Sequence, residues 1–293
     1  MASKLIVIDP GHEYEETGST QTDGGREAAF TLALARATRD ALLAGYDCRV
    51  VLTHDGPGMV PGGDLAAELR ARGELPNKLG AAFFISIHHN AGPSSARGGE
   101  LYIWTNKRNA EGGLLWLPAV DPATGVPNHQ AHRSFEVATV MQPILRDALD
   151  KLGIPWRGAQ NRIMCADFAV LRYPELPCAL LETHYGTNQK DDDVADSPTF
   201  IPALAAAIAQ ALAAGLQLGP KLSASGFPVI RIKMVDGATV AGELRGQTTW
   251  IDIEGTWFPL RPVLKKVGLE PVWHGAEQPG GPWIDVVVAP AGE

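Results

Sequence analysis

The chain has 293 residues, of which 45% are hydrophobic and 20% charged, and its formal net charge is −8. This composition excludes a mainly disordered chain, and the charge argues against a protein that binds nucleic acid or an anionic membrane through phosphate contacts. Its cysteines, Cys48, Cys165 and Cys178, are too few and too scattered for a disulfide framework or a thiolate metal site. No segment approaches the roughly 20 apolar residues that span a bilayer, and the apolar run 5–8 is too short for a signal peptide. We therefore expect synthesis in the cytoplasm and no membrane insertion.

Short apolar runs and longer amphipathic stretches alternate over the first two thirds of the chain. We expect strands at 4–9, 48–53, 82–88, 99–104, 168–171 and 178–182, and helices at 26–44, 64–75, 134–152 and 199–214, the third of them kinked at Pro143. Continuous apolar strands that alternate with helices are typical of parallel sheets. The sequence therefore predicts an α/β fold, in which a mostly parallel twisted sheet carries helices on both faces.

Two other parts of the chain differ in composition. Residues 105–133 show no clear period, which predicts a long excursion that is either functional or an ornamental surface insertion. Residues 218–228 have the Gly, Pro and Ser content of a linker, and residues 229–293 are short, strand-like and turn-rich, with one helix expected near 260–267. We therefore expect a first domain at 1–217 and a small β-rich domain after the linker.

Four ionisable residues are expected at one edge of the predicted sheet. They are His12 after the first strand, His88 and Glu182 at the ends of later strands, and Glu27 at the start of the first long helix. Ligands and catalytic groups gather where parallel strands end and where the helices of right-handed crossovers begin. Two imidazoles and one carboxylate are a common catalytic zinc set, and a further carboxylate can act as the base for a water molecule.

Position also separates the roles of the two glutamates. Glu27 is the better candidate for a ligand because a helix start holds it rigidly, and Glu182 is the better candidate for the base because it follows an apolar strand. The alternative, in which each histidine is an ordinary core or surface residue, stays open on these residues alone. The run His12–Glu16 lacks the second histidine of H-E-x-x-H, and the chain has no G-x-S-x-G segment of a serine hydrolase.

Five elements in matching order make the first domain resemble a known family. They are Asp9–His12, Gly25–Glu27, Arg72 with Asn77 and then Ser86–Asn90, Val170–Arg172, and Pro177–Glu182 with Asn188 after it. Over about residues 4–215 the chain resembles the zinc-dependent N-acetylmuramoyl-L-alanine amidases of the amidase-3 family, found in bacterial autolysins and phage endolysins. The resemblance implies that His12, Glu27 and His88 bind Zn²⁺ and that Glu182 is the catalytic carboxylate.

The same resemblance implies peptidoglycan as substrate, cleaved at the amide between N-acetylmuramic acid and L-alanine. Three further residues are candidates for contacting the substrate or supporting the metal ligands, namely Asn90, Arg172 and His184. The sequence departs from the family at Pro76, where Ala is usual and where we expect the helix to end or bend. His54 stands where an Arg is common, and His184 where a Gly is common.

The C-terminal region resembles, more loosely, the small stalk domain similar to the N-terminal domain of copper amine oxidases. Gly255–Arg261 and Val267–Trp273 carry this resemblance. We expect a role in wall targeting, or in self-association into a homo-oligomer, with most tryptophans in the core of the small domain. Two other functions stay open, a zinc peptidase that cuts within stem peptides and a wall-binding protein without activity. Because no export signal is seen, the expected setting is a phage or prophage endolysin released through a membrane pore.

Overall fold

The computed structural model describes residues 3–12, 18–22, 24–56, 64–104, 129–157 and 163–221, together with six strands between 229 and 288. The chain forms two compact units. The first contains Met1–Leu42 and Cys48–Leu218, and the second contains Leu43–Asp47 and Gly219–Glu293. The domain boundaries expected from the sequence stay predictions.

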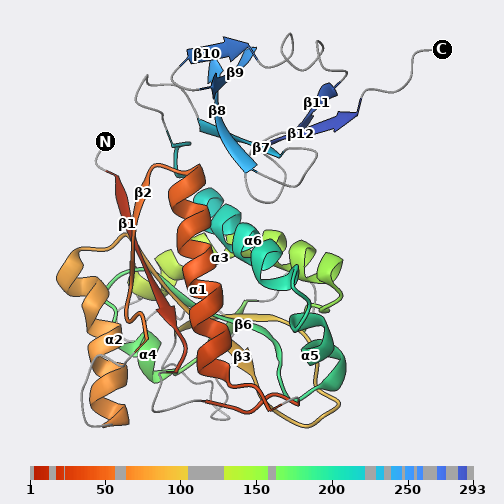
Figure 1. Cartoon of the computed structure of the whole chain (residues 1–293). Helices are drawn as coiled ribbons and strands as arrows, with labels where there is room; N and C mark the ends of the chain where they lie inside the picture. The colour runs from red at the N-terminus through yellow and green to blue at the C-terminus, as the bar shows by residue number, and fades with distance from the viewer. Residues whose placement is uncertain are drawn as a thin grey trace. The chain divides into compact units, whose positions relative to one another are not determined.

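A six-stranded sheet forms the centre of the first unit, in the order β2-β1-β3-β6-β4-β5 (Figure 1). Its strands are β1 (Lys4–Pro10), β2 (Cys48–Leu52), β3 (Phe83–Asn90), β4 (Glu100–Trp104), β5 (Met164–Ala166) and β6 (Cys178–Tyr185). Neighbouring strands run parallel, except that β4 is antiparallel to β6. The predicted mostly parallel sheet is therefore confirmed.

Helices cover both faces of this sheet (Figure 1). They are α1 (Glu27–Gly45), α2 (Leu65–Leu79), α3 (His129–Leu152), α4 (Ala169–Arg172), α5 (Gln189–Ala195) and α6 (Phe200–Leu216). On one face, Val7, Phe84 and Leu180 of the strands pack against Val170 and Leu171 of α4, with α2 alongside. On the other face, α3 packs along α6.

The structure corrects two local expectations. Residues 168–171 are not a strand, because Phe168 is the last extended residue and the next four form the short helix α4. A four-residue apolar run buries equally well as a strand or as one helical turn, so its pattern does not separate them. Helix α2 does not end at Pro76 but continues to Leu79, where Gly80 closes it at a φ of 61°. A proline so near the helix end removes one hydrogen bond without breaking the helix.

Other boundaries also differ from the expected ones. Helix α3 begins at His129, five residues before the expected start at 134, and runs through Pro143 without interruption. Strand β5 and helix α5 were not expected from the sequence. The rest of the expected excursion at 105–128, and the expected helix near 260–267, lie outside the described residues.

The second unit is β-rich, as predicted. Its strands are β7 (Val229–Lys233), β8 (Thr239–Arg245), β9 (Thr248–Ile253), β10 (Thr256–Pro259), β11 (Leu269–His274) and β12 (Trp283–Val288). They form one sheet in the order β10-β9-β8-β7-β12-β11, antiparallel except where β12 meets β7. Whether the tryptophans of this unit form its core or contact the cell wall concerns side chains outside the described residues.

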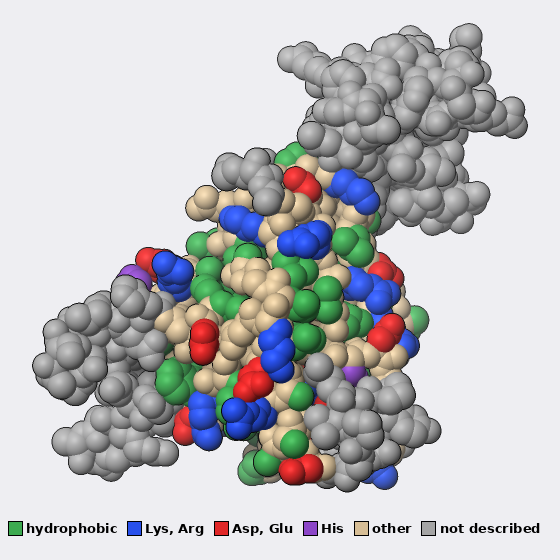
Figure 2. Space-filling view, turned by 90° about the vertical axis from the view of Figure 1, so that its left-hand side faces the viewer, with side chains coloured by type: hydrophobic (Ala, Val, Ile, Leu, Met, Phe, Trp, Pro, Cys, Tyr) green, Lys and Arg blue, Asp and Glu red, His purple; other side chains and the backbone are tan. Residues whose placement is uncertain are grey.

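The surface charges and the length of the helices can be compared with what a nucleic-acid-binding or membrane-inserted protein would show. On the face drawn in Figure 2, acidic and basic side chains are interspersed, with hydrophobic side chains between them. The described side chains on that face therefore form no extended patch of one sign. Among the described helices, none is long and apolar enough by itself to cross a membrane, and only the pair α5 and α6, bent by 85° at its junction, meets the length and composition criterion.

Candidate metal centre

Three side chains that can bind a metal ion converge at the carboxyl edge of the sheet. His12 follows β1, His88 lies near the end of β3, and Glu27 is the first residue of α1. Each of the three side chains offers one nitrogen or oxygen atom as a ligand, and these three atoms all lie within 4.8 Å of one another. Among the described residues, no other His, Cys, Asp or Glu side chains form such a group of three. The structure thus brings together the three ligand candidates named from the sequence.

The contacts within this group suit a bound cation. Glu27 Oε1 lies 2.9 Å from His88 Nδ1, and Glu27 Oε2 lies 3.2 Å from His12 Nε2. Burial opposes ionisation of Glu27, but hydrogen bonds to both imidazoles hold its pKa well below the usual range. Lone pairs of oxygen and nitrogen cannot face each other this closely, so each gap requires a proton or a metal cation. Ligands of a tetrahedral zinc ion lie about 3.4 Å apart, so small side-chain shifts suffice to close the group around zinc.

Two glycines leave space for these side chains. A Cβ atom on Gly11 would lie 2.4 to 2.6 Å from three atoms of the His88 ring. Gly18 has a φ of +69°, and its Cβ would lie 2.6 Å from His12 Cδ2 and 2.7 Å from Glu27 Oε2. His12 itself has a φ of 62°, a left-handed conformation that strains a residue with a Cβ and is concentrated at functional sites. The backbone is therefore shaped around the three ligand candidates.

A buried ion pair fixes the end of β1 shortly before His12. Arg72 of α2 donates from Nε to Asp9 Oδ1 at 2.7 Å and from Nη2 to Asp9 Oδ2 at 2.8 Å. Thr53 and Ser86 each donate a hydroxyl to Asp9 at 2.6 Å. Burial alone would raise the pKa of Asp9, but Arg72 and the two hydroxyls together lower it, so the carboxylate stays ionised. The Asp9–Arg72 pair therefore gives a structural reason for two residues of the family-like motifs.

Glu27 is held by three further donors. Ser19 donates to Glu27 Oε2 from its backbone N–H at 3.0 Å and from its hydroxyl at 3.1 Å, and the His89 backbone N–H donates to Oε1 at 3.3 Å. The Ser19 hydroxyl also lies 3.3 Å from His89 Nδ1. Because the hydroxyl proton is directed to the carboxylate, His89 Nδ1 must carry its own proton to bond with Ser19. Sequence reasoning missed Ser19, which lies outside the strands and helices, and His89, which follows His88 near the end of β3 but belongs to no metal-ligand pattern.

Glu182 lies across from His88 on the neighbouring strand. His88 pairs with Glu182 between β3 and β6, and Glu182 pairs with Glu100 between β6 and β4, so the three side chains share one face of the sheet. Glu182 is buried, and its Oε2 has no hydrogen-bond partner among the described residues. Burial, and then the charges of Glu27 and Glu100, raise the pKa of Glu182 well above its usual value. A carboxyl group with a raised pKa binds a proton more tightly, which suits a group that takes up a proton and then returns it.

Glu100 anchors a second polar cluster beside Glu182. Its Oε2 accepts hydrogen bonds from Asn90 Nδ2 at 2.8 Å and from the hydroxyls of Tyr102 and Tyr185, each at 3.2 Å. Its other oxygen lies 3.6 Å from Arg157 Nε. Asn90, one of the additional candidates from the sequence, therefore donates a hydrogen bond to Glu100 in the structure.

His184 occupies a buried aromatic environment. Its ring lies 4.9 Å from that of Phe30, 5.9 Å from that of Phe200 and 5.0 Å from that of His89. Its Nδ1 lies 2.9 Å from the Thr183 hydroxyl. Burial lowers the pKa of His184 to about 3, so the ring is neutral at physiological pH. His184 therefore packs behind the metal-ligand candidates as a neutral imidazole.

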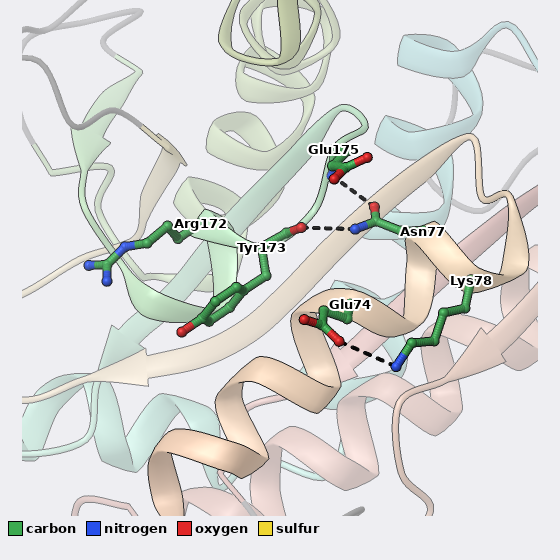
Figure 3. A pocket seen from close by; sticks show the side chains of 6 residues that line it. All are labelled: Glu74, Asn77, Lys78, Arg172, Tyr173 and Glu175. Atoms are coloured by element: carbon green, nitrogen blue, oxygen red, sulfur yellow. Dashed lines mark hydrogen bonds and ion pairs between the residues drawn. The ribbon is translucent and has the colours of Figure 1, made fainter.

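Arg172 lies at the other edge of the sheet. Together with Glu74, Asn77, Lys78, Tyr173 and Glu175 it lines a pocket of about 380 Å³ between the end of α2 and the segment before β6 (Figure 3). Asn77 joins the two walls of the pocket, since it donates to the Tyr173 carbonyl oxygen and accepts from the Glu175 N–H. The pocket lies where β6 begins, and Glu182 lies towards the end of that strand. The structure therefore does not bring Arg172 to the metal-ligand candidates.

A mostly parallel α/β sheet, with a His-Glu-His group and a buried carboxyl group at its carboxyl edge, is compatible with a metal-assisted hydrolase. Comparison with known proteins identifies the family to which this chain belongs. The model of the family described as N-acetylmuramoyl-L-alanine amidase matches residues 6–214, and the chain belongs to this family.

Comparisons with individual proteins support this family membership. The chain is 32% identical over 229 residues to the amidase AmiC of Neisseria meningitidis, an alignment that covers 73% of this chain and about half, 52%, of that protein. It is 26% identical over 227 residues to the endolysin of Bacillus phage SPP1, covering 76% of this chain and 70% of the endolysin. The catalytic domain of CwlV, an N-acetylmuramoyl-L-alanine amidase from Bacillus (Paenibacillus) polymyxa, is similar in structure with a TM-score of 0.57 and 25% identity, over 74% of this chain and 99% of that domain.

Proposed function

We propose that this chain is a zinc-dependent N-acetylmuramoyl-L-alanine amidase that hydrolyses the amide between N-acetylmuramic acid and L-alanine in peptidoglycan. The observation that carries the proposal is the meeting of His12, Glu27 and His88 beside the buried carboxyl group of Glu182. Membership of the amidase family supports the choice of substrate.

Each residue of the group has a separate role in this proposal. His12, Glu27 and His88 hold the metal ion, and Ser19 keeps the Glu27 carboxylate in place. When bound, zinc supplies a Lewis acid that polarises the scissile carbonyl group and lowers the pKa of water to about 7. Glu182 takes a proton from the attacking water and returns it to the leaving amine, and its raised pKa suits both transfers.

Digestion of purified peptidoglycan tests the proposal. Zinc-loaded protein and an EDTA-treated sample are incubated with the same substrate, and the products are identified by mass spectrometry. We expect stem peptides that begin with a free L-alanine, together with unsubstituted glycan, only in the zinc-loaded sample. Cuts within the stem peptides would instead establish the peptidase, and binding to the wall without cleavage would establish the inactive wall-binding protein.

A variant pair tests the role of Glu182. Glu182→Gln removes the proton acceptor but keeps the shape of the side chain, so we expect turnover to fall by a factor of about 100 to 10,000 while zinc stays bound. Glu136→Gln is the matched control, because Glu136 is an exposed residue of α3 whose recorded ion pair is with His132 of the same helix. Near-normal turnover by Glu182→Gln would show that another group moves the proton.

We further propose that the enzyme acts on the cell wall and that residues 229–293 serve wall targeting or self-association. The similarity to a phage endolysin supports the first part. Release through a membrane pore stays a prediction. Co-sedimentation of the full chain with purified walls, compared with a chain that ends at Leu218, tests the targeting role. Analytical ultracentrifugation of the same two chains tests self-association.

A further inference from the structure

The positively charged side chain of Arg157 lies next to the proposed catalytic edge. The proposed reaction gives this side chain no role. Its side chain is 46% exposed, whereas the Glu100 carboxylate that it faces is 4% exposed. The guanidinium lies over the Tyr185 ring, 4.9 Å from the ring centroid, and Nη1 donates to the Tyr185 hydroxyl. A guanidinium that rests on an aromatic ring with one side in solvent is oriented and still accessible.

The backbone fixes the base of this side chain. The Arg157 N–H donates to the Gly99 carbonyl oxygen at 3.0 Å, and the Gly99 N–H donates to the Pro155 carbonyl oxygen at 2.9 Å. Gly98 has a φ of +109°, and a Cβ there would lie 2.3 Å from that Pro155 oxygen. Residues 155–157 therefore pack against Gly98 and Gly99, which directly precede Glu100 at the start of β4.

The ion pair with Glu100 leaves most of the N–H donors of Arg157 available. Glu100 Oε2 already accepts three hydrogen bonds from the neutral donors Asn90, Tyr102 and Tyr185. The 3.6 Å from Arg157 Nε to Glu100 Oε1 is beyond hydrogen-bond length. Arginine has five N–H donors, and among the described residues the one side-chain hydrogen bond recorded for Arg157 is that to Tyr185. The guanidinium can therefore form a bidentate pair with an added carboxylate.

Because Arg157 faces Glu100, the sheet register gives the approximate distance from Arg157 to His88 of the metal centre. His88, Glu182 and Glu100 lie side by side on three adjacent strands and on one face. Adjacent strands are about 4.8 Å apart, so Glu100 lies about 10 Å from His88. An extended peptide advances about 3.3 to 3.6 Å per residue, so this distance corresponds to about three residues. A ligand group at Arg157 therefore lies within the first few residues from a scissile amide held at His88.

We propose that Arg157 binds the free carboxylate of the second residue of the stem peptide, an inference that rests on the proposed amidase function. Within this reach the glycan side of the scissile amide offers only neutral hydroxyl and acetamide groups. The peptide side offers the α-carboxyl group of the glutamate that follows L-alanine, which is free in some peptidoglycans and amidated in others. The peptide therefore lies over β6 and β4, and Arg157 selects stems with a free carboxylate.

Two synthetic muramoyl peptides that differ only in this group test the proposal. One carries glutamate and the other its α-amide, and both are cleaved by the full-length zinc-loaded chain. We expect a KM about 10 to 100 times lower for the free carboxylate, as a charge-assisted pair predicts. Arg157→Met should raise the KM of that substrate alone by the same factor, change kcat by less than about threefold, and leave zinc affinity unchanged.

Two further variants separate recognition from structural damage. Arg157→Lys keeps the charge, so we expect it to recover part of the preference. Arg70→Met is the matched control, because Arg70 also pairs with a glutamate, Glu74, and lies over a tyrosine ring, that of Tyr173 at 5.9 Å, but on α2. Equal KM values of the wild type for both substrates, or equal losses on both with Arg157→Met, would overturn the assignment.

A binding measurement keeps this inference distinct from the proposed function. Calorimetric titration of both muramoyl peptides into zinc-loaded Glu182→Gln protein does not depend on turnover. If the wild type cleaves neither peptide, the amidase proposal fails. A preference for the free carboxylate in this titration, absent in Glu182→Gln/Arg157→Met, would still support Arg157 as the carboxylate-binding residue. Equal affinity for both peptides would refute it.

Discussion

Replacing Gly11 with alanine isolates the contribution of backbone space to the metal centre. The added Cβ would lie 2.4 Å from His88 Cε1, 2.5 Å from Nδ1 and 2.6 Å from Nε2, against the usual 3.5 to 4.0 Å between non-bonded heavy atoms. The backbone cannot retreat easily, because the Gly11 N–H donates to the Ile87 carbonyl oxygen at 2.8 Å and the Gly11 carbonyl accepts the Thr31 hydroxyl at 2.6 Å. The His88 ring must therefore move by about 1 Å.

A shift of this size is large for a metal ligand. Ligand distances in metal sites hold to about 0.2 Å, so Gly11→Ala effectively removes one of three ligands. We expect zinc affinity, measured by competition with a chromogenic chelator, to fall at least about 100-fold, which exceeds the usual effect of mutating groups behind the ligands. Overpacking should destabilise the metal-free protein by about 1 to 3 kcal/mol.

Gly45→Ala is the control, because a Cβ on Gly45 at the end of α1 has nothing within 4 Å. It should leave zinc affinity unchanged and stabilise the helix by about 0.5 to 1 kcal/mol. If Gly11→Ala bound zinc as tightly as the wild type, His88 would not be a ligand in the position that the structure gives it.

Three further predictions concern the surroundings of the site. Ser19→Ala removes the hydroxyl donor to Glu27, and zinc affinity measured by the same competition should fall about 10- to 100-fold; unchanged affinity would mean that the backbone N–H suffices. Arg72→Met leaves Asp9 buried without its cation and should reduce the free energy of unfolding in urea by about 3 to 5 kcal/mol, whereas a loss below 1 kcal/mol would show that the pair is solvated. Because burial lowers the pKa of His184 to about 3 from about 6.5 in the unfolded chain, the unfolded chain binds more protons between these values, and stability should fall by about 2 kcal/mol from pH 7 to pH 5. His184→Phe should flatten this dependence, and an equal slope in both proteins would assign it to other groups.

The strands that lead to the metal centre could be predicted because each is a continuous apolar run that ends in a polar residue. In β1 the residues 5–10 are all buried, and the run stops at His12. Parallel pairing then brings the ends of β1 and β3 together, so two ligand candidates can be inferred from pattern and topology alone. Whether His12, Glu27, His88 and Glu182 perform the roles proposed for them is a matter for the variants above.

Residues that act through contacts between distant segments could not be predicted in this way. Ser19 reaches Glu27 from a loop, and Glu100 reaches Asn90 and Tyr185 across two strand pairings. Neither contact leaves a periodic signal in the sequence. Short elements were missed for a related reason, since the three residues of β5 and the four of α4 are too few to show a period.

The reversed direction of β4 decides which segments next to it lie at the proposed catalytic edge. The other central strands deliver residues to the carboxyl edge at their ends or just beyond them, as β1 does with His12. Strand β4 runs against β6, so it delivers Glu100, at its start, and the chain leaves it at Trp104 towards the opposite edge. A change in length between Asn90 and Glu100 would therefore enter the chain at the proposed catalytic edge, whereas a change directly after Trp104 would enter it at the opposite end of β4.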